Sequence, residues 1–168
     1  MIPANQTNDV TMASKQSKEL ATLYASIAER ISKPDIDLAT IRDISENLHL
    51  GAAEPEAVSY AEVDADGVPA LWCIPQGCAM DRVLLYGHGG GSVVTSMHTD
   101  RKAIAHIAKA VGVRALVLNF RRSPEHKFPA QFDDVEKAYR WLLAERIRPE
   151  NIATLASLLA VRSPWVWP

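Results

Sequence analysis

Cysteine, excess charge and long apolar runs are all scarce in this sequence of 168 residues, and each shortage argues against a class of protein. Cys73 and Cys78 are its only cysteines, so it has neither a disulfide framework nor the paired CxxC motifs of a zinc site. The net charge of −2 and the lack of a basic stripe argue against nucleic-acid binding. No apolar run approaches the roughly 18 residues that a membrane-spanning helix needs. The polar start of the chain has no signal-peptide pattern, and we expect a cytoplasmic protein with reduced thiols.

Enough apolar residues remain for one folded domain, since 48% of the residues are hydrophobic and 23% are charged. A chain of this length buries roughly 68–70% of its unfolded surface, which allows a substantial core. Apolar residues at helical spacing predict a helix over 14–33, which Pro34 ends. Asp37 is placed to cap a second helix, which closes at Gly51. We therefore expect residues 1–50 to form a helical segment.

From residue 51 to residue 168 the pattern changes to strands that alternate with helices. Asp66-Gly67 is a strong two-residue hairpin signal between apolar runs at 57–64 and 68–74. The elements predicted after this hairpin are, in order, a strand at 82–86, a helix at 99–111, a strand at 113–120, a helix at 132–146 and a strand at 152–155. This β-α-β-α-β order predicts an α/β fold with a parallel sheet and right-handed crossovers. Ligands of such sheets bind beyond the carboxyl ends of the strands.

A loop that reads GHGGG over residues 87–91 follows the first of these parallel strands. Consecutive glycines cost backbone entropy, but they let backbone N–H groups approach a ligand closely. The loop matches neither GxGxxG nor GxxxxGK[ST], so a nucleotide site has little support, and a plain strand-to-helix turn is another alternative. An oxyanion hole fits better, because donors aimed at the developing alkoxide of acyl transfer contribute about 3–4 kcal/mol each. HGGG after a strand is the form that this device takes in lipases and esterases.

A second block follows the next strand and reads RRSPEHKFPA over residues 121–130. Asp133 opens the helix after it, and residues 138–142 read AYRWL. Together with the HGGG loop, this block resembles the hormone-sensitive-lipase-like esterases, the HGGG branch of the α/β-hydrolase fold, whose own block reads close to DYRLAPEHPFPA. The resemblance runs from about residue 57 to residue 153. It implies the N-terminal half of such a domain, with a helical cap segment over 1–50 and then a hairpin and a parallel βαβαβ unit within 51–168.

The resemblance also implies a role for each residue of the two loops. Gly90 and Gly91 would donate their N–H groups to the oxyanion, while His88 and Gly89 would shape the oxyanion loop. Ser92 stands where the family commonly has an aromatic residue, which changes the shape of the acyl pocket. The residues that would brace the loop from below are Arg121, Glu125 and His126. The implied activity is hydrolysis of small-molecule carboxylic esters by a serine esterase, with no cofactor.

The catalytic half of that machinery is missing from the sequence. No GxSxG nucleophile motif occurs, and no acid and histidine follow where the family has them. Ser157 lies near the expected place, but Ala156 and Leu158 do not make a nucleophile elbow. We therefore expect no member of the catalytic triad here, and an esterase by descent that is inactive as given. No metal site is expected either, because carboxylates and cysteines at ligand spacing are lacking around the remaining histidines, His49, His98 and His106.

The last residues of the sequence offer one explanation. Reading each codon from its third base, starting at Leu155, permits G-[QE]-S-A-G-G and then an apolar helix start, which is the family's elbow at the expected position. We hypothesise that a frameshift near residues 154–156 replaced the catalytic half with a short tail. The alternative is a genuine strand and terminus, with Trp165 and Trp167 packed on the sheet.

A hypothesis of another class is a non-catalytic interaction module, which pairs through an unfinished sheet edge with a full-length homologue. A small-ligand binder that uses the glycine loop is a third alternative. The sequence leaves open the ester, the acyl chain length and the oligomeric state, a homo-oligomer included.

Overall fold

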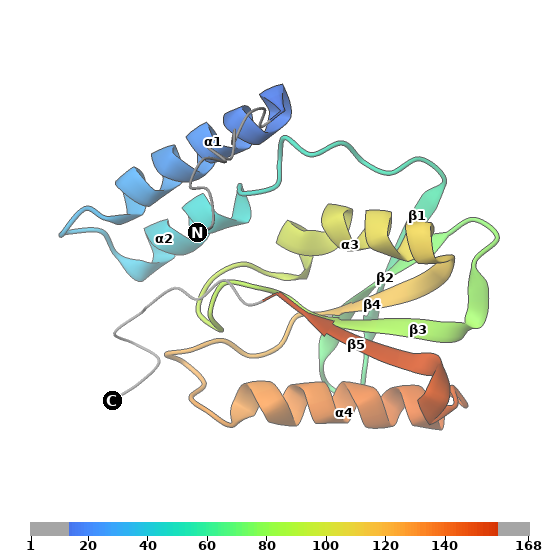
Figure 1. The fold of residues 1–168 in the computed structure, drawn as a ribbon. Helices are drawn as coiled ribbons and strands as arrows, with labels where there is room; N and C mark the ends of the chain where they lie inside the picture. Colours follow the sequence, from blue (N-terminus) through green and yellow to red (C-terminus); the bar gives the residue numbers. More distant parts are fainter. Residues whose placement is uncertain (1–13, 158–168) are drawn as a thin grey trace, which may run out of the picture. The chain divides into compact units, whose positions relative to one another are not determined.

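The structure is a computed structural model that describes residues 14–157, and Figure 1 shows its ribbon. The chain divides into two units, Met1–Ile36 and Asp37–Pro168. The described part of the first unit, residues 14–36, contains the helix α1 (Lys15–Ile31). Its cap is Ser14, whose hydroxyl accepts a hydrogen bond from the Ser17 N–H at 3.1 Å. The helix predicted over 14–33 is therefore confirmed, within the usual shift of a residue or two at each end.

The second unit begins with the helix α2 (Leu38–Glu46). Asp37 caps this helix as predicted, because its carboxylate accepts a hydrogen bond from the Thr40 N–H at 2.7 Å. The predicted end at Gly51 is wrong, since the last helical residue is Glu46. The chain continues in tight turns after it, where the Asn47 N–H bonds back to the Ile44 carbonyl at 3.3 Å.

A mixed sheet of five strands forms the centre of this unit, in the order β1-β2-β4-β3-β5. The strands are β1 (Val58–Asp64), β2 (Pro69–Pro75), β3 (Ala79–Gly87), β4 (Val113–Leu118) and β5 (Ile152–Ala156). The hairpin strands β1 and β2 pair antiparallel, and β2 also pairs antiparallel with β4. The pairs β3–β4 and β3–β5 are parallel. Both the predicted hairpin and the predicted parallel βαβαβ unit are therefore confirmed.

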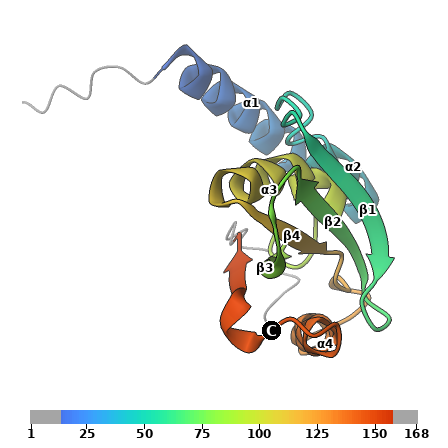
Figure 2. The same cartoon turned by 90° about the vertical axis from the view of Figure 1, so that its right-hand side faces the viewer.

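The helices α3 (Met97–Val111) and α4 (Ala130–Ala144) cover opposite faces of the sheet, as Figure 2 shows. The strand β4 contributes side chains to the core on both faces of the sheet, because successive side chains of a strand point to opposite sides. Leu116 and Leu118 pack in the core on the α4 side, and Ala115 and Val117 pack in the core on the α3 side. All four are fully buried, which is why residues 115–118 form a continuous apolar run in the sequence.

Local signals set the ends of these elements. Ser96 starts α3 with a capping box, in which Thr99 bonds back to the Ser96 N–H at 3.0 Å, so this helix begins two residues before the predicted start. Gly112 ends it in the left-handed conformation with φ 75°, as predicted. β3 begins at Ala79, earlier than the predicted residue 82, and its pairing with β4 is irregular between Ala79 and Val83. Trp165 and Trp167 lie outside the described residues.

Candidate functional site

The glycine loop, defined as residues 87–96, joins β3 to α3 at the carboxyl end of β3. The sheet register brings neighbouring strand ends to the same place, since Gly87 pairs with Leu118 of β4 and with Ala156 of β5. The loop that follows β4 and the residue that follows β5 therefore start beside the glycine loop. The chain after β5 touches it directly, because the Ser157 N–H donates to the Gly87 carbonyl at 3.4 Å.

The backbone of the glycine loop is left-handed at four positions. Gly90 and Gly91 have φ of 87° and 60°, while the non-glycine residues Ser92 and Thr95 have φ of 61° and 64°. Position 90 requires glycine, because a Cβ there would lie 2.3 Å from the Val94 carbonyl oxygen. Left-handed conformations at serine and threonine cost energy, and such strain is typical of functional sites.

Peptide planes in the glycine loop direct two N–H groups away from the acceptors of residues 14–157. The Gly89 carbonyl accepts a bond from the Thr95 hydroxyl at 2.7 Å. The Gly90 carbonyl accepts from the Val93 and Val94 N–H groups, each at 3.1 Å. Among residues 14–157, no acceptor binds the N–H of Gly90 or of Gly91. These are the two N–H groups that the family resemblance nominated for an oxyanion, and their role as its donors stays a prediction.

His88 is a structural element of the loop in this geometry. Its ring is 3% exposed and stacks on Phe120, with the ring centres 4.0 Å apart and the planes 5° from parallel. Nδ1 lies 2.9 Å from the Gly89 carbonyl oxygen and 3.1 Å from Thr95 Oγ1, whereas Nε2 has no partner within the described part of the chain. Burial lowers the pKa of His88, so the ring is neutral at neutral pH.

A buried carboxylate in the first turn of α3 binds the start of the glycine loop. Asp100 accepts hydrogen bonds from the Gly89 N–H at 3.1 Å and from the Tyr86 hydroxyl at 2.8 Å. His49 Nδ1 lies 3.3 Å from its other oxygen. Burial alone would raise the pKa of Asp100, but the bonds from His49, Gly89 and Tyr86 hold it below its usual value. The bond to Asp100 in turn raises the pKa of His49. Sequence reasoning missed this group because no short motif links Asp100 to residues 11 and 14 positions earlier, or to the more distant His49.

Arg42 of α2, which sequence reasoning also missed, joins the glycine loop to the block at 121–130. Its guanidinium donates to the Val93 carbonyl at 2.9 Å and to the Ser123 carbonyl at 2.8 Å. The same group binds both carboxylate oxygens of Glu125, at 2.6 and 2.7 Å. This bidentate bond lowers the pKa of Glu125 to about 2.

Further contacts tie the two loops together. The Ser123 N–H donates to the Ser92 carbonyl at 2.8 Å, and Arg122 donates to the Thr95 carbonyl at 2.7 Å. Glu46 of α2 accepts the Ser96 hydroxyl at 2.8 Å. We call Arg42 and Glu46, with the bonds they make to the two loops, the Arg42 clamp. Its only signal in the sequence is the spacing of these two residues, which are four positions apart and so lie on one helix face.

The three residues nominated as braces have different surroundings. Glu125 reaches the glycine loop through Arg42. Arg121 instead binds Asp134 of α4, with its Nη2 2.7 Å from the carboxylate, and so holds the start of that helix. The exposed His126 accepts a bond at its backbone carbonyl from the Gln131 side chain at 2.7 Å. Their roles as braces stay predictions.

The positions nominated for a nucleophile and for metals are placed as follows. Ser157 is exposed, and its Oγ lies 3.3 Å from where a Cβ on Gly89 would be. His98 is 4.0 Å from Glu62, and His106 lies 3.1 Å from the Ala53 carbonyl. Residues 14–157 contain no cluster of three or more metal-binding side chains. The described helices include none long and apolar enough to cross a membrane.

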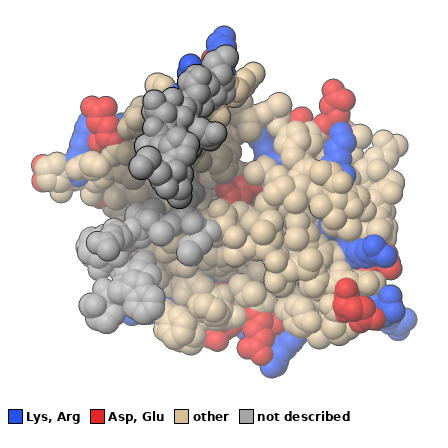
Figure 3. Space-filling view, viewed as in Figure 1, with Lys and Arg blue, Asp and Glu red and all other residues tan. Residues whose placement is uncertain are grey.

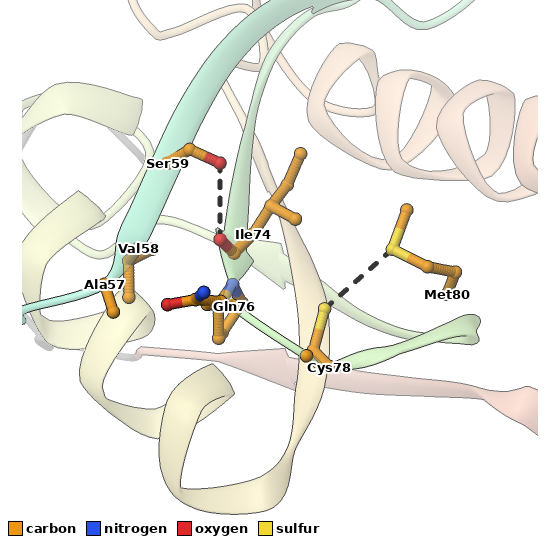
Figure 4. Close-up of a pocket in the computed structure, with 9 residues that line it drawn as sticks. Ala57, Val58, Ser59, Ile74, Gln76, Cys78 and Met80 are labelled. Atoms are coloured by element: carbon orange, nitrogen blue, oxygen red, sulfur yellow. Dashed lines mark hydrogen bonds between the residues drawn. The ribbon is translucent and has the colours of Figure 1, made fainter.

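Two surface features lie outside the glycine loop. An open pocket of about 540 Å³ occupies the other end of the sheet, where β2 ends and β3 begins (Figure 4). Its lining is mostly apolar and includes Ile74, Pro75, Cys78 and Met80. The face of the molecule in Figure 3 carries acidic and basic side chains intermixed, without a stripe of one sign.

The chain resembles known hydrolases in sequence and in fold. Residues 84–157 match the family of the alpha/beta hydrolase fold. An acetyl-hydrolase of Streptomyces hygroscopicus is 32% identical over 145 residues, which cover 75% of this chain and 47% of that protein. An ethyl acetate hydrolase of Pseudomonas putida is 37% identical over 62 residues, which cover 37% of this chain and 20% of that protein.

A solved structure extends this likeness to the fold. An esterase from the bacterial hormone-sensitive lipase family is 37% identical, and it aligns with 86% of this chain at a TM-score of 0.76. This chain covers 48% of that esterase, and it spans less than half of the length of the curated relatives named above. The fold, the two loops and these likenesses agree, and the chain belongs to the α/β-hydrolase fold family, in its hormone-sensitive-lipase-like branch, of which it matches the N-terminal half.

Proposed function

We propose that this chain carries the oxyanion-binding half of a carboxylic ester hydrolase of the serine esterase type. The observation that carries the proposal is the geometry of the glycine loop, in which the N–H groups of Gly90 and Gly91 have no acceptor among residues 14–157. In acyl transfer a serine attacks the ester carbonyl, and the oxygen that becomes negative needs donors placed in advance. Two such N–H groups contribute about 3–4 kcal/mol each to transition-state stabilisation.

The substrate class is a small carboxylic ester with a short acyl chain. The relatives named above include an acetyl-hydrolase and an ethyl acetate hydrolase, and acetyl is among the smallest acyl groups. Ser92 follows the HGGG sequence in place of a larger aromatic residue. Water then cleaves the acyl-enzyme, and no cofactor enters the reaction.

A polypeptide of these residues alone is proposed to be inactive, because it has the oxyanion loop without a nucleophile elbow. A chimera tests both parts of this proposal. Residues 1–157 are joined to the remaining half of the solved esterase of the hormone-sensitive lipase family, which supplies a serine, an acid and a histidine. We expect the chimera to hydrolyse p-nitrophenyl butyrate and a serine-directed phosphonate to abolish that turnover.

The chain of 168 residues is the matched control, and we expect it to give no phosphonate-sensitive turnover. Such turnover by the 168-residue chain would contradict the proposed inactivity. A folded chimera that does not hydrolyse the ester would contradict the assignment of the oxyanion loop.

A second candidate function, pairing with a full-length homologue, is favoured by the exposure of β5. In the described part of the sheet this strand lies at the edge and pairs only with β3. Its residues from Ala153 to Ala156 are exposed, and Leu155 is 40% exposed, whereas strands in parallel sheets are normally buried on both faces. An open strand edge is a template for another strand. Co-purification with a complete esterase at a defined ratio would support this function, and an isolated monomer would contradict it.

The remaining expectations belong to the same proposal. A cytoplasmic location is supported by the two thiols, which are free, with Cys73 buried and Cys78 half-buried. We propose that the complete fold binds a small-molecule ester and does not bind nucleic acid. A homo-oligomer is the alternative to a monomer.

A further inference from the structure

The buried acid of α3, Asp100, contacts the glycine loop at the Gly89 N–H, a bond that the proposed reaction does not by itself require. Its side chain is 8% exposed, and it accepts hydrogen bonds from the Gly89 N–H and the Tyr86 hydroxyl. The His49 Nδ1 lies 3.3 Å from it and 3.0 Å from the Thr99 carbonyl oxygen. A buried carboxylate is costly unless it is paired and hydrogen-bonded. The three groups around this carboxylate offset the cost of burying it, which indicates that the carboxylate has a role at the glycine loop.

The peptide planes of the loop show what the carboxylate controls. In a planar trans peptide the C=O and the following N–H point in opposite directions, so holding one aims the other. The Gly89 carbonyl is held by Thr95, and this aims the Gly90 N–H. The Gly90 carbonyl is held by Val94, and this aims the Gly91 N–H. Asp100 holds the plane before these two, through the Gly89 N–H.

We propose that Asp100 is a positioning residue of the oxyanion loop: by binding the Gly89 N–H it fixes the first of three consecutive peptide planes. Thr95 and Val94 then hold the next two planes, whose N–H groups have no acceptor among residues 14–157. The bond sets the direction of the chain as it leaves β3, and the following planes then turn through left-handed glycines. The inference rests on the proposed function for its purpose, and on the hydrogen bonds of the loop for its mechanism.

A negative charge beside an oxyanion would repel it, and the surroundings of Asp100 offset that charge. His49, 3.3 Å away, is the nearest cation when protonated. The other titratable or charged groups around Asp100 and His88 are Tyr86 on β3, Glu46 on α2 and Arg122 on the loop after β4. Asp100→Asn therefore keeps an acceptor for the Gly89 N–H while it removes the charge, which separates positioning from electrostatics.

The test is an NMR measurement on the full chain labelled with ¹⁵N, which needs no catalytic activity. In Asp100→Ala we expect the amide signals of Gly89, Gly90 and Gly91 to shift, and hydrogen exchange at Gly89 to accelerate by roughly tenfold or more, since one bond is lost. Asp100→Asn restores both. The matched control is Asp134→Ala, which removes another buried carboxylate on the α4 side and leaves these three signals in place.

Three results would overturn the proposal: unchanged glycine signals in a folded Asp100→Ala, an Asp100→Asn as disruptive as Asp100→Ala, or a loss of the same signals in Asp134→Ala. If Asp100→Ala does not fold, a measurement on the unmodified chain still tests the proposal. In that chain labelled with both ¹⁵N and ¹³C, a scalar coupling across the hydrogen bond, between the Gly89 nitrogen and the Asp100 side-chain carbon, is expected, and its absence overturns the proposal.

The chimera described above then connects positioning to turnover. We expect Asp100→Ala in the chimera to lower kcat by roughly 100-fold with a smaller effect on KM, and Asp100→Asn to recover most of kcat. An inactive parent chimera would contradict the proposed function but would leave the NMR result on Asp100 standing. An active chimera with unmoved glycine signals in Asp100→Ala would contradict this inference alone.

Discussion

Two turns of this molecule use left-handed residues, and they are held in different ways. The hairpin turn between β1 and β2 places Asp66 at φ 60° and Gly67 at φ 83°, and both residue types tolerate this conformation. Its stabilising bond is local, from the Gly67 N–H to the Asp64 carboxylate at 2.5 Å. The glycine loop places Ser92 and Thr95 in the same conformation, although neither type favours it.

The glycine loop has local bonds too, such as that from the Thr95 hydroxyl to the Gly89 carbonyl, but further restraints come from distant parts of the chain. Arg42 binds Val93 across 51 residues, and Arg122 binds Thr95 across 27 residues. The two turns therefore differ in what determines their backbone conformation. The hairpin turn has a conformation that its own residue types prefer, whereas the glycine loop has a conformation that contacts with other parts of the chain impose. Backbone strain of the second kind persists only where the surroundings over-determine it, as at functional sites.

The largest expected difference between the two turns is the loss of stability when one glycine in each turn is replaced by alanine. Gly90→Ala brings a Cβ to 2.3 Å from the Val94 carbonyl at φ 87°, and we expect a loss of about 3 kcal/mol in the free energy of unfolding. Gly67→Ala has a similar φ but no atom within 4 Å of the new Cβ, so only the backbone penalty of about 1 kcal/mol applies. Urea unfolding of both variants measures the difference, and equal losses would contradict it.

The next effect is the loss of the long-range clamp. Arg42→Ala removes hydrogen bonds to the Val93 and Ser123 carbonyls and a bidentate bond to Glu125, and we expect a loss of about 2–3 kcal/mol. The control is Arg140→Ala, which removes an exposed ion pair to Glu136 and is expected to cost less than about 0.5 kcal/mol. Comparable losses in the two variants, again by urea unfolding, would mean that the clamp does not stabilise the loop.

The same contrast explains how much of this molecule could be predicted from its sequence. The Asp66-Gly67 turn, the Gly112 helix end and the buried run of β4 are local patterns, and the structure confirms all three. The HGGG motif is local as well, and the oxyanion role that the resemblance implies for Gly90 and Gly91 stays a prediction. Arg42 and Asp100 could not be assigned, because their partners are set by tertiary packing and no short pattern contains both ends of those bonds. The predicted end of α2 was wrong for a related reason. Gly51 is a helix stop signal, but the helix already ends at Glu46, where the chain enters tight turns.

A smaller effect is expected from pH at the Arg42 clamp. Its bond to Arg42 lowers the pKa of Glu125 from 4.5 to about 2. The pair therefore contributes stability above pH 4.5, and this contribution is lost as the pH falls from 4.5 towards 2. Other carboxylates titrate in the same range, so the quantity to measure is the difference in free energy of unfolding between the unmodified chain and Glu125→Gln.

We expect that difference to shrink to zero towards pH 2, and to be reduced by salt at neutral pH because the carboxylate is exposed. A difference that does not change with pH would show that the glutamine substitution acts through packing and not through charge.

The smallest effect is a gain in stability from relieving strain in the glycine loop. Ser92 has φ 61°, and its side chain makes no hydrogen bond to any other described residue. Ser92→Gly therefore removes a left-handed penalty of about 1–2 kcal/mol at the cost of greater freedom in the unfolded chain, for a net gain of about 0.5–1 kcal/mol. Asp66→Gly, at nearly the same φ of 60°, should gain less because aspartate tolerates this conformation. If thermal unfolding shows Ser92→Gly to be less stable than the unmodified chain, then the serine is not strained, and the loop resembles the hairpin turn after all.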